Sequence, residues 1–298
     1  MNCILCDWEY KKYISWFDNT HTATRDQFEI LKCVMCGLEK TIIDANQLWK
    51  YYPKDYYSYT WWLNGMERII RNWYNSFQNR KFNFLKYVFY GKLIKYPCGL
   101  WWWNFLDIWC WNNSHFKFLS TYWWDCSGFE VGKWWWVNNI FYAPNILTFD
   151  SDKTYDRITL RHVLEHFDRP TEYMLKISSL MNNDSKLVIS VPNQDSWYAK
   201  LFWSYWYNRD TPRHLYNWSP KTLSILWTWA WLKIDKIYHQ SLFSWANSLL
   251  LLFKYKLWYS DKLISILRPL LYFIFYPFDL LSNLLRKWDV ITVIFFKS

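Results

Sequence analysis

The chain has 298 residues, of which 35 are Lys or Arg and 25 are Asp or Glu, so its formal net charge is +10. The length suits one large domain or one domain with a small appendage. The positive charge is spread along the chain without a dense basic–aromatic patch, which argues against a nucleic-acid substrate. The polar start at Met1–Cys3 predicts no signal peptide, and seven cysteines then indicate a reducing, cytoplasmic location.

Tryptophan and glycine occur in unusual proportions. The chain has 26 Trp and only 6 Gly, whereas average usage of about 7% predicts roughly 20 Gly. Runs of three Trp at 101–103 and 134–136 are difficult to pack in a core. We therefore hypothesise that a codon read as glycine in the source, with UGA as the candidate, is translated here as tryptophan. The alternative is a protein that is truly rich in tryptophan.

The first 45 residues carry two CxxC motifs and are expected to form a zinc-knuckle module. Four thiolates at this spacing can close a tetrahedral structural zinc site, and Gly37 permits the tight turn after the second motif. The predicted ligands are Cys3, Cys6, Cys33 and Cys36. The alternative is a set of buried cysteines without a metal.

Residues 46–99 are interpreted as a helical connector, with its helix over 66–77. Residues 100–298 alternate strand-like apolar runs with helical stretches, which is typical of α/β sheets. Strands are predicted at 105–108, 124–130, within 155–166, and at 185–193, 232–239 and 289–297, with a helix over 114–121. The order indicates a doubly wound, Rossmann-like sheet that binds ligands at the carboxyl ends of its strands.

The stretch "LDIWCWNNSHFKFL" (106–119) has the form of a strand, a turn and a helix. With glycine in place of Trp109 and Trp111, it resembles the first motif of class I S-adenosylmethionine-dependent methyltransferases. In that family a glycine turn lets the backbone approach the cofactor, and an acidic residue ending the second strand holds the ribose hydroxyls. Glu130 stands at the expected distance, and Trp123 before it is another candidate glycine position.

The resemblance implies S-adenosylmethionine as the methyl donor and a set of residues that bind it. The set is Asp107, Ile108, Trp109, Cys110, Trp111, Glu130, Arg161 and His162. With real tryptophans at 109 and 111 the indoles would fill this site. The alternative function is then a catalytically inactive, methyltransferase-like scaffold or binding protein.

The segment "YDRITLRHVLEHFDRP" (155–170) also resembles these methyltransferases, whose fourth strand commonly runs into a His-x-x-Glu-His segment. His162 and His166 also match an inverted zinc-protease motif. That motif needs a long helix and a third ligand, whereas this segment directly follows a strand and soon reaches Pro170. Glu165 and His166 could equally be structural.

The segment 191–220 resembles a bacterial subgroup of these enzymes with Val-Pro-Asn and Pro-Arg-His-Leu motifs. Asp210, Arg213 and His214 are predicted to face the substrate, with a salt-bridged loop as the alternative. The candidate bases are His162, His166 and His214. Ser219 and Pro220 predict a helix start, and Trp231 stands where a glycine turn is expected.

The resemblance covers nearly the whole chain, and the subgroup is similar to enzymes of glycan, lipid or secondary-metabolite pathways. It implies methyl transfer to a small-molecule, glycan or lipid-linked acceptor. Residues 241–287 form a late, apolar helical insertion without a run long enough to span a membrane. They could lie on the cytoplasmic membrane surface and admit a lipid-linked substrate, or pack as a lid over the active site.

Overall fold

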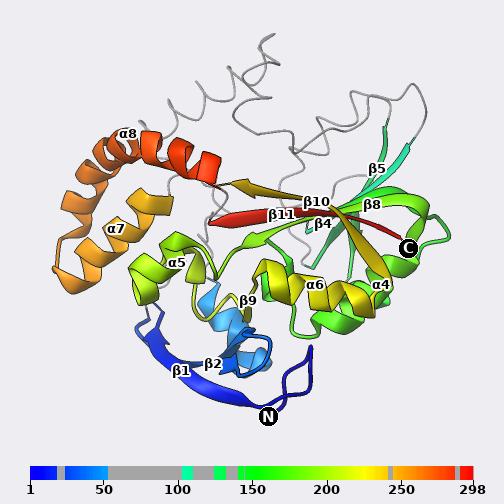
Figure 1. Cartoon of the computed structure of the whole chain (residues 1–298), viewed down its shortest axis with the longest axis horizontal. Coiled ribbons are helices and arrows are strands. Elements are labelled where there is room, and N and C mark those ends of the chain that lie inside the picture. The colour runs from blue at the N-terminus through cyan, green and yellow to red at the C-terminus, as the bar shows by residue number, and fades with distance from the viewer. Residues whose placement is uncertain are drawn as a thin grey trace, which may run out of the picture.

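A computed structural model describes residues 1–18, 24–52, 103–109, 124–131, 140–143, 145–240, 244–285 and 289–297. The predicted helices over 66–77 and 114–121 lie outside the described residues. Figure 1 shows a large twisted sheet, a small sheet that contains the N-terminal strands, and a pair of long helices beside them.

The large sheet has seven strands in the order β10-β11-β8-β7-β4-β5-β6. Their bounds are β4 (Trp103–Ile108), β5 (Trp124–Glu130), β6 (Ile140–Tyr142), β7 (Tyr155–Arg161), β8 (Met181–Pro192), β10 (Leu232–Gln240) and β11 (Val290–Lys297). The pairs from β8 to β6 are parallel, and β11 runs antiparallel to both of its neighbours. The predicted α/β architecture with a mainly parallel sheet is therefore confirmed.

The strand order reverses between β4 and β7. From β4 the chain adds β5 and β6 on one side, then returns to place β7 and β8 on the other. Because Ile108 pairs with Leu160, the two strands end side by side. Parallel sheets bind ligands at such a reversal, beyond the carboxyl ends of the strands. Residues that follow 108 and 161 are therefore the first candidates for a site.

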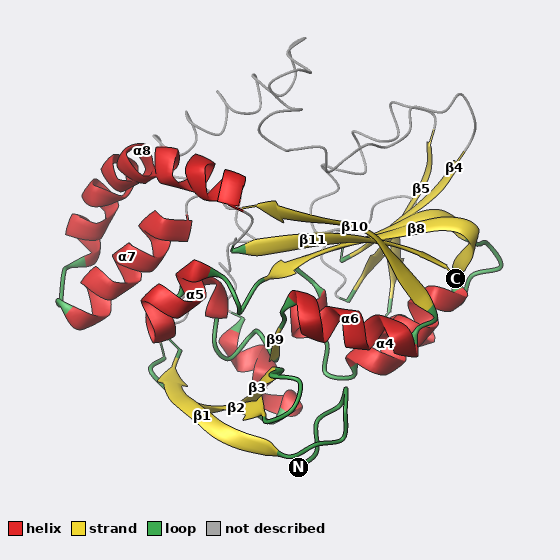
Figure 2. Ribbon diagram, in the orientation of Figure 1, coloured by secondary structure: helices red, strands yellow, loops and turns green. Residues whose placement is uncertain are grey.

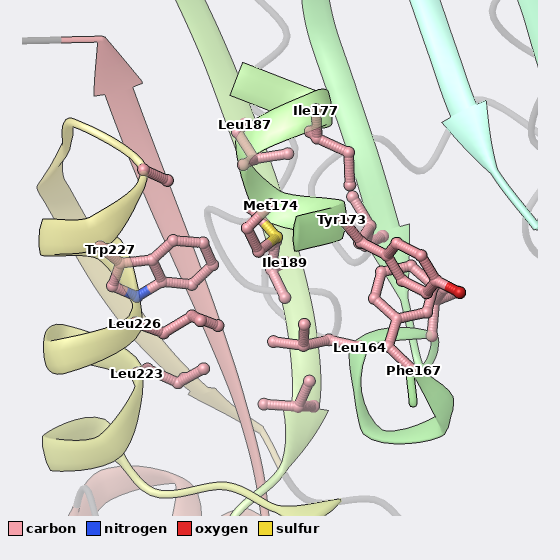
Figure 3. Close-up of a cluster of buried hydrophobic side chains, with 14 of the residues drawn as sticks. Leu164, Phe167, Tyr173, Met174, Ile177, Leu187, Ile189, Leu223, Leu226 and Trp227 are labelled. Carbon is pink, nitrogen blue, oxygen red and sulfur yellow. The ribbon is translucent and has the colours of Figure 1, made fainter. Parts of the chain in front are cut away.

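Two amphipathic helices, α4 (Pro170–Ser179) and α6 (Pro220–Trp229), cover one face of this sheet (Figure 3). Their buried side chains meet Leu187 and Ile189 of β8. As predicted, α6 begins with a cap: the Ser219 hydroxyl accepts a hydrogen bond from the Thr222 amide at 3.2 Å, and Pro220 follows. Proline suits this position because it lacks an amide that the helix would leave unpaired.

The small sheet joins residues that are far apart in the sequence. It contains β1 (Tyr10–Phe17), β2 (Gln27–Cys33), β3 (Glu39–Ile42) and β9 (Tyr216–Asn217). Its fourth strand pairs with β3 in antiparallel register, with Glu39 opposite Asn217. The N-terminal segment therefore shares main-chain pairing with a loop of the C-terminal half. The proposed boundary at residue 45 stays a prediction.

The late insertion forms a hairpin of helices α7 (Ser244–Lys256) and α8 (Asp261–Leu285) between β10 and β11 (Figure 2). Ala246, Leu250, Ile264 and Leu271 are buried in its interior. The hairpin packs through Trp245 on Tyr198 and Phe202 of α5 (Trp197–Phe202). None of the helices within the described ranges has the length and apolarity that a membrane span needs.

Candidate functional site

Trp109 directly follows β4 and lies in the left-handed backbone region, with φ 56°. Its amide donates a hydrogen bond to the Phe129 carbonyl at 2.7 Å. Its indole lies against the rings of His166 and Phe167, with centroids 5.5 and 6.0 Å away. This conformation favours glycine because a Cβ crowds the following carbonyl. Cys110 and Trp111, also predicted to bind the cofactor, lie outside the described residues.

Tryptophan recurs at other left-handed positions of the described chain. Of the eight non-glycine residues with positive φ, four are tryptophan: Trp109, Trp203, Trp231 and Trp258, with φ between 50° and 59°. Bulky residues rarely adopt this region. The glycine-type turn expected at 231 is confirmed, with φ 55°. This clustering supports the hypothesis that tryptophan stands for glycine at such positions.

Asp107 and Ile108 approach the site from β4 and are both buried. One carboxylate oxygen of Asp107 accepts a hydrogen bond from the Thr159 hydroxyl at 2.5 Å, and the other lies 3.2 Å from the Arg161 guanidinium. Arg161 is half-exposed at the end of β7. The structure thus brings together three of the predicted cofactor residues and fixes the carboxylate between two donors.

Glu130 is the last residue of β5 and is partly exposed. The pairing of Ile108 with Phe129 puts it beside the turn at Trp109. Its carboxylate accepts a hydrogen bond from the Val131 amide at 3.0 Å. The acid and the turn therefore lie at the same edge, as the sequence predicts.

His162 and His166 follow β7, on the other side of the strand reversal. His162 has φ 55°, and its Nδ1 lies 3.4 Å from Oε1 of Glu165. A short 3-10 helix, Leu164–His166, replaces the predicted helix start, and α4 begins only at Pro170. Because the two histidines do not share an α-helix, the structure argues against the inverted zinc-protease motif.

Glu165 and His166 are buried, and each shifts the pKa of the other. Burial and the neighbouring His214 lower the pKa of the His166 imidazole to about 4, so this ring is neutral at pH 7. Burial alone would raise the pKa of the Glu165 carboxyl. His162, His214 and His166 together hold the pKa of Glu165 below its ordinary value. Glu165 therefore carries a buried negative charge at the sheet edge.

Comparison with known protein families matches residues 71–232, more than half of the chain, to a methyltransferase domain. The chain belongs to the methyltransferase domain family. The match includes β4, β5, β7 and β8, which carry the residues above. The predicted enzyme class is thereby confirmed.

Several solved structures resemble the methyltransferase domain in fold. An S-adenosylmethionine-dependent methyltransferase from Archaeoglobus fulgidus is 18% identical, with 73% of this chain and 100% of that chain covered and a TM-score of 0.45. The 1,6-didemethyltoxoflavin-N1-methyltransferase of Burkholderia thailandensis is 11% identical, with 66% and 71% covered and a TM-score of 0.41. The N-methyltransferase NodS of Bradyrhizobium japonicum is 14% identical, with 65% and 78% covered and a TM-score of 0.38. No curated protein matches the chain.

The structure corrects the predicted role of Arg213 in the methyltransferase domain. Its side chain is fully buried, and its guanidinium donates to Asp210 at 2.8 Å, Asp18 at 2.9 Å and the Tyr51 carbonyl at 2.8 Å. With these donors engaged and no exposed surface, Arg213 is not available to clamp a substrate. The salt-bridged loop, the alternative at this position, is what the structure has.

Asp210 and His214 are buried around the same loop. Nε2 of His214 lies 3.9 Å from a carboxylate oxygen of Asp210 and 3.9 Å from Glu165 Oε1. The rings of His214 and His166 meet edge to face, with centroids 4.8 Å apart. The loop therefore brings His214 to Glu165 and His166, whereas Asp210 forms an ion pair with Arg213.

The four predicted zinc ligands of the methyltransferase chain gather at one point of the N-terminal module. The sulfurs of Cys3 and Cys36 are 3.5 Å apart, those of Cys6 and Cys33 are 3.4 Å apart, and all four lie within 4.8 Å of one another. Contact with Cys36 lowers the pKa of the Cys3 thiol to about 4. The residues after each motif, Asp7 and Gly37, have φ 59° and 83°. Their amides donate to the carbonyls of Cys3 and Cys33, so the two turns are equivalent.

The sequence did not predict two polar neighbours of the candidate cofactor site at the carboxyl edge of the large sheet. Tyr52 places its hydroxyl 3.0 Å from Nδ1 of His166, and Thr159 holds Asp107. Tyr52 belongs to the segment "YYPKDYYS" (51–58), and nothing in that sequence indicates a contact with a residue so far along the chain. Thr159 faces Asp107 only because β4 and β7 pair in this register.

Proposed function

We propose that the methyltransferase domain transfers a methyl group from S-adenosylmethionine to a small-molecule, glycan or lipid-linked acceptor. The observation that supports this most is the pairing of a glycine-type turn at 109 with the Glu130 carboxylate across β4 and β5. S-adenosylmethionine, when bound, supplies an activated methyl group on a sulfonium. Residues 107–109 and Glu130 would hold it, with the carboxylate accepting from the ribose hydroxyls.

Among the candidate bases, His162 has the arrangement that best suits proton removal from an acceptor. Its side chain is half-exposed at the carboxyl edge, and Glu165 lies 3.4 Å from its Nδ1. A carboxylate in this position orients an imidazole and stabilises its protonated form. His166 and His214 are buried, and Nδ1 of each lies at a backbone carbonyl. We therefore infer that His162 is the base.

Glu130→Gln is expected to weaken S-adenosylmethionine binding by about 10- to 100-fold, because hydrogen bonds to a charged group contribute about 1.5–3 kcal/mol. The measurement is isothermal titration of the chain with glycine at 109 and 111. Asp125→Asn is the control, because Asp125 lies on the same strand and pairs with Lys153 away from the turn. An unchanged affinity in Glu130→Gln would contradict the proposed role, and no binding by the parent chain would contradict the function.

We also propose that the four cysteines of the N-terminal module bind a structural zinc ion. Four thiolates within 4.8 Å of one another suit its tetrahedral coordination and leave no position for water. Titration of the thiols with a mercurial reagent is expected to release zinc. Cys3→Ser with Cys36→Ser should abolish this release and lower the Tm by at least about 5 °C. Cys126→Ser, a buried cysteine outside the cluster, should retain it. Zinc release that survives loss of Cys3 and Cys36 would argue against the site.

Contact of residues 241–287 with a membrane surface stays a prediction. An exposed apolar face of α8 supports it, formed by Leu263, Ile266, Leu270, Phe273, Ile274 and Phe278. Lys256 and Lys262, at the turn between the helices, are exposed beside it and could meet anionic headgroups. This face would suit an acceptor that is linked to lipid.

A further inference from the structure

Glu165, His166 and His214 form a buried cluster at the carboxyl edge of the large sheet. One ligand atom from each lies within 4.8 Å of the other two. Glu165 is 1% exposed, and within the described part of the structure neither of its oxygens accepts a hydrogen bond. Its nearest basic neighbours are His162, with Nδ1 3.4 Å from Oε1, and His214, with Nε2 3.9 Å from the same oxygen. A buried carboxylate that accepts no hydrogen bond is costly, so this arrangement favours a bound positive charge.

Both histidines place Nδ1 at a backbone carbonyl. Nδ1 of His166 lies 2.9 Å from the Arg213 carbonyl, and Nδ1 of His214 lies 2.9 Å from the Asn208 carbonyl. A carbonyl only accepts, so each Nδ1 carries the proton and each Nε2 presents a lone pair. Histidines that bind metals usually donate their other nitrogen to a carbonyl or carboxylate in this way.

We propose that Glu165, His166 and His214 bind a divalent transition-metal cation, at a second site separate from the four cysteines. Two imidazoles and one carboxylate suit zinc, iron, cobalt or nickel. Three protein ligands leave at least one coordination position open. The site lies beside Trp109 and His162, so an oxygen of the acceptor could occupy that position. This last use rests on the proposed methyl transfer, whereas the cation site does not.

The test is a titration of the metal-free, full-length chain with Co²⁺, followed by absorption and by metal analysis after gel filtration. We expect two cobalt ions per chain. The ion at the cysteines gives an intense thiolate charge-transfer band, and the ion at Glu165 adds only weak d–d bands. X-ray absorption of chain that carries one equivalent of zinc at the four cysteines and one equivalent of Co²⁺ should show imidazole ligands and no sulfur around cobalt.

Substitution separates the two sites. Glu165→Gln and His214→Asn are each expected to lower the affinity for the second cobalt ion by at least about 100-fold. Loss of even a residue that only hydrogen-bonds to a ligand typically lowers metal affinity by about 10–100-fold. The charge-transfer band should remain. Cys3→Ser with Cys36→Ser should remove that band and keep the second ion. Glu172→Gln is the matched control, because Glu172 is exposed on α4 and pairs with Arg169.

A single cobalt ion per chain with a thiolate spectrum would overturn the proposal, as would a second ion that survives Glu165→Gln. In that case a protonated histidine neutralises Glu165. The X-ray absorption measurement needs no variant, so a substitution that prevents folding leaves the test intact. S-adenosylmethionine binding is titrated in parallel. Loss of the second cobalt ion alone would contradict the cation site, and absence of S-adenosylmethionine binding alone would contradict the proposed methyl transfer.

Discussion

The chain with glycine at positions 109 and 111 is expected to bind S-adenosylmethionine about 100-fold more tightly than the chain with tryptophan at both positions. Trp109 has φ 56°, and its indole fills the edge beside His166 and Phe167. Excess volume in a packed site costs up to about 3 kcal/mol, which corresponds to about 100-fold in Kd. Isothermal titration of the two forms measures the difference.

Trp231→Gly with Trp258→Gly is the matched control for this comparison. Both residues have positive φ and are mostly exposed, at 74% and 78%, on elements away from the turn at 109. Relief of the left-handed backbone should raise the free energy of unfolding by about 1 kcal/mol for each change. The affinity for S-adenosylmethionine should not change. Equal affinities of the forms with glycine and tryptophan at 109 and 111 would contradict the proposed turn.

Mass spectrometry of the native protein tests the same hypothesis directly. Peptides that cover 109 and 231 are expected to contain glycine. Tryptophan at both positions would refute the codon hypothesis and favour the inactive scaffold.

Arg213→Met is expected to lower the free energy of unfolding by about 3–5 kcal/mol. The change leaves Asp18, which is fully buried, and the buried Asp210 without their shared cation. It also removes a donor from the Tyr51 carbonyl. Denaturant unfolding monitored by circular dichroism gives the value.

Arg169→Met provides the comparison for this large loss. Arg169 also contacts two carboxylates, Asp168 and Glu172, but all three side chains are about half-exposed. Exposed ion pairs contribute at most about 1 kcal/mol. A loss in Arg213→Met no larger than that in Arg169→Met would show that the loop does not depend on this buried network.

Local signals in the sequence were sufficient to locate most strands of the large sheet. The apolar runs at 185–193, 232–239 and 289–297 stand between turns, and each corresponds to a strand. The N-cap at Ser219 was predictable for the same reason, since a cap depends on residues within one turn. The number of residues between the turn at 109 and Glu130 also predicted that the acid ends the next strand.

Contacts between distant segments were not predictable in the same way. Arg213 resembles a substrate clamp in its motif, but its partner Asp18 lies 195 residues earlier. Glu165 and His214 meet only because the loop before β9 returns to the end of β7. No pattern within either segment reports that meeting, because it depends on how the sheets pack.

The shared small sheet has a consequence for the order in which the protein is made. Strands β1 to β3 leave the ribosome early, but β9 and the cations that neutralise Asp18 and Glu39 are synthesised much later. Until Arg209 and Arg213 emerge, Glu39 and Asp18 lack their buried arginine partners, and the edge of β3 lacks the strand that pairs with it. The small sheet is therefore completed only after the C-terminal half is synthesised. Until then the unpaired edge of β3 is exposed to pairing with other chains.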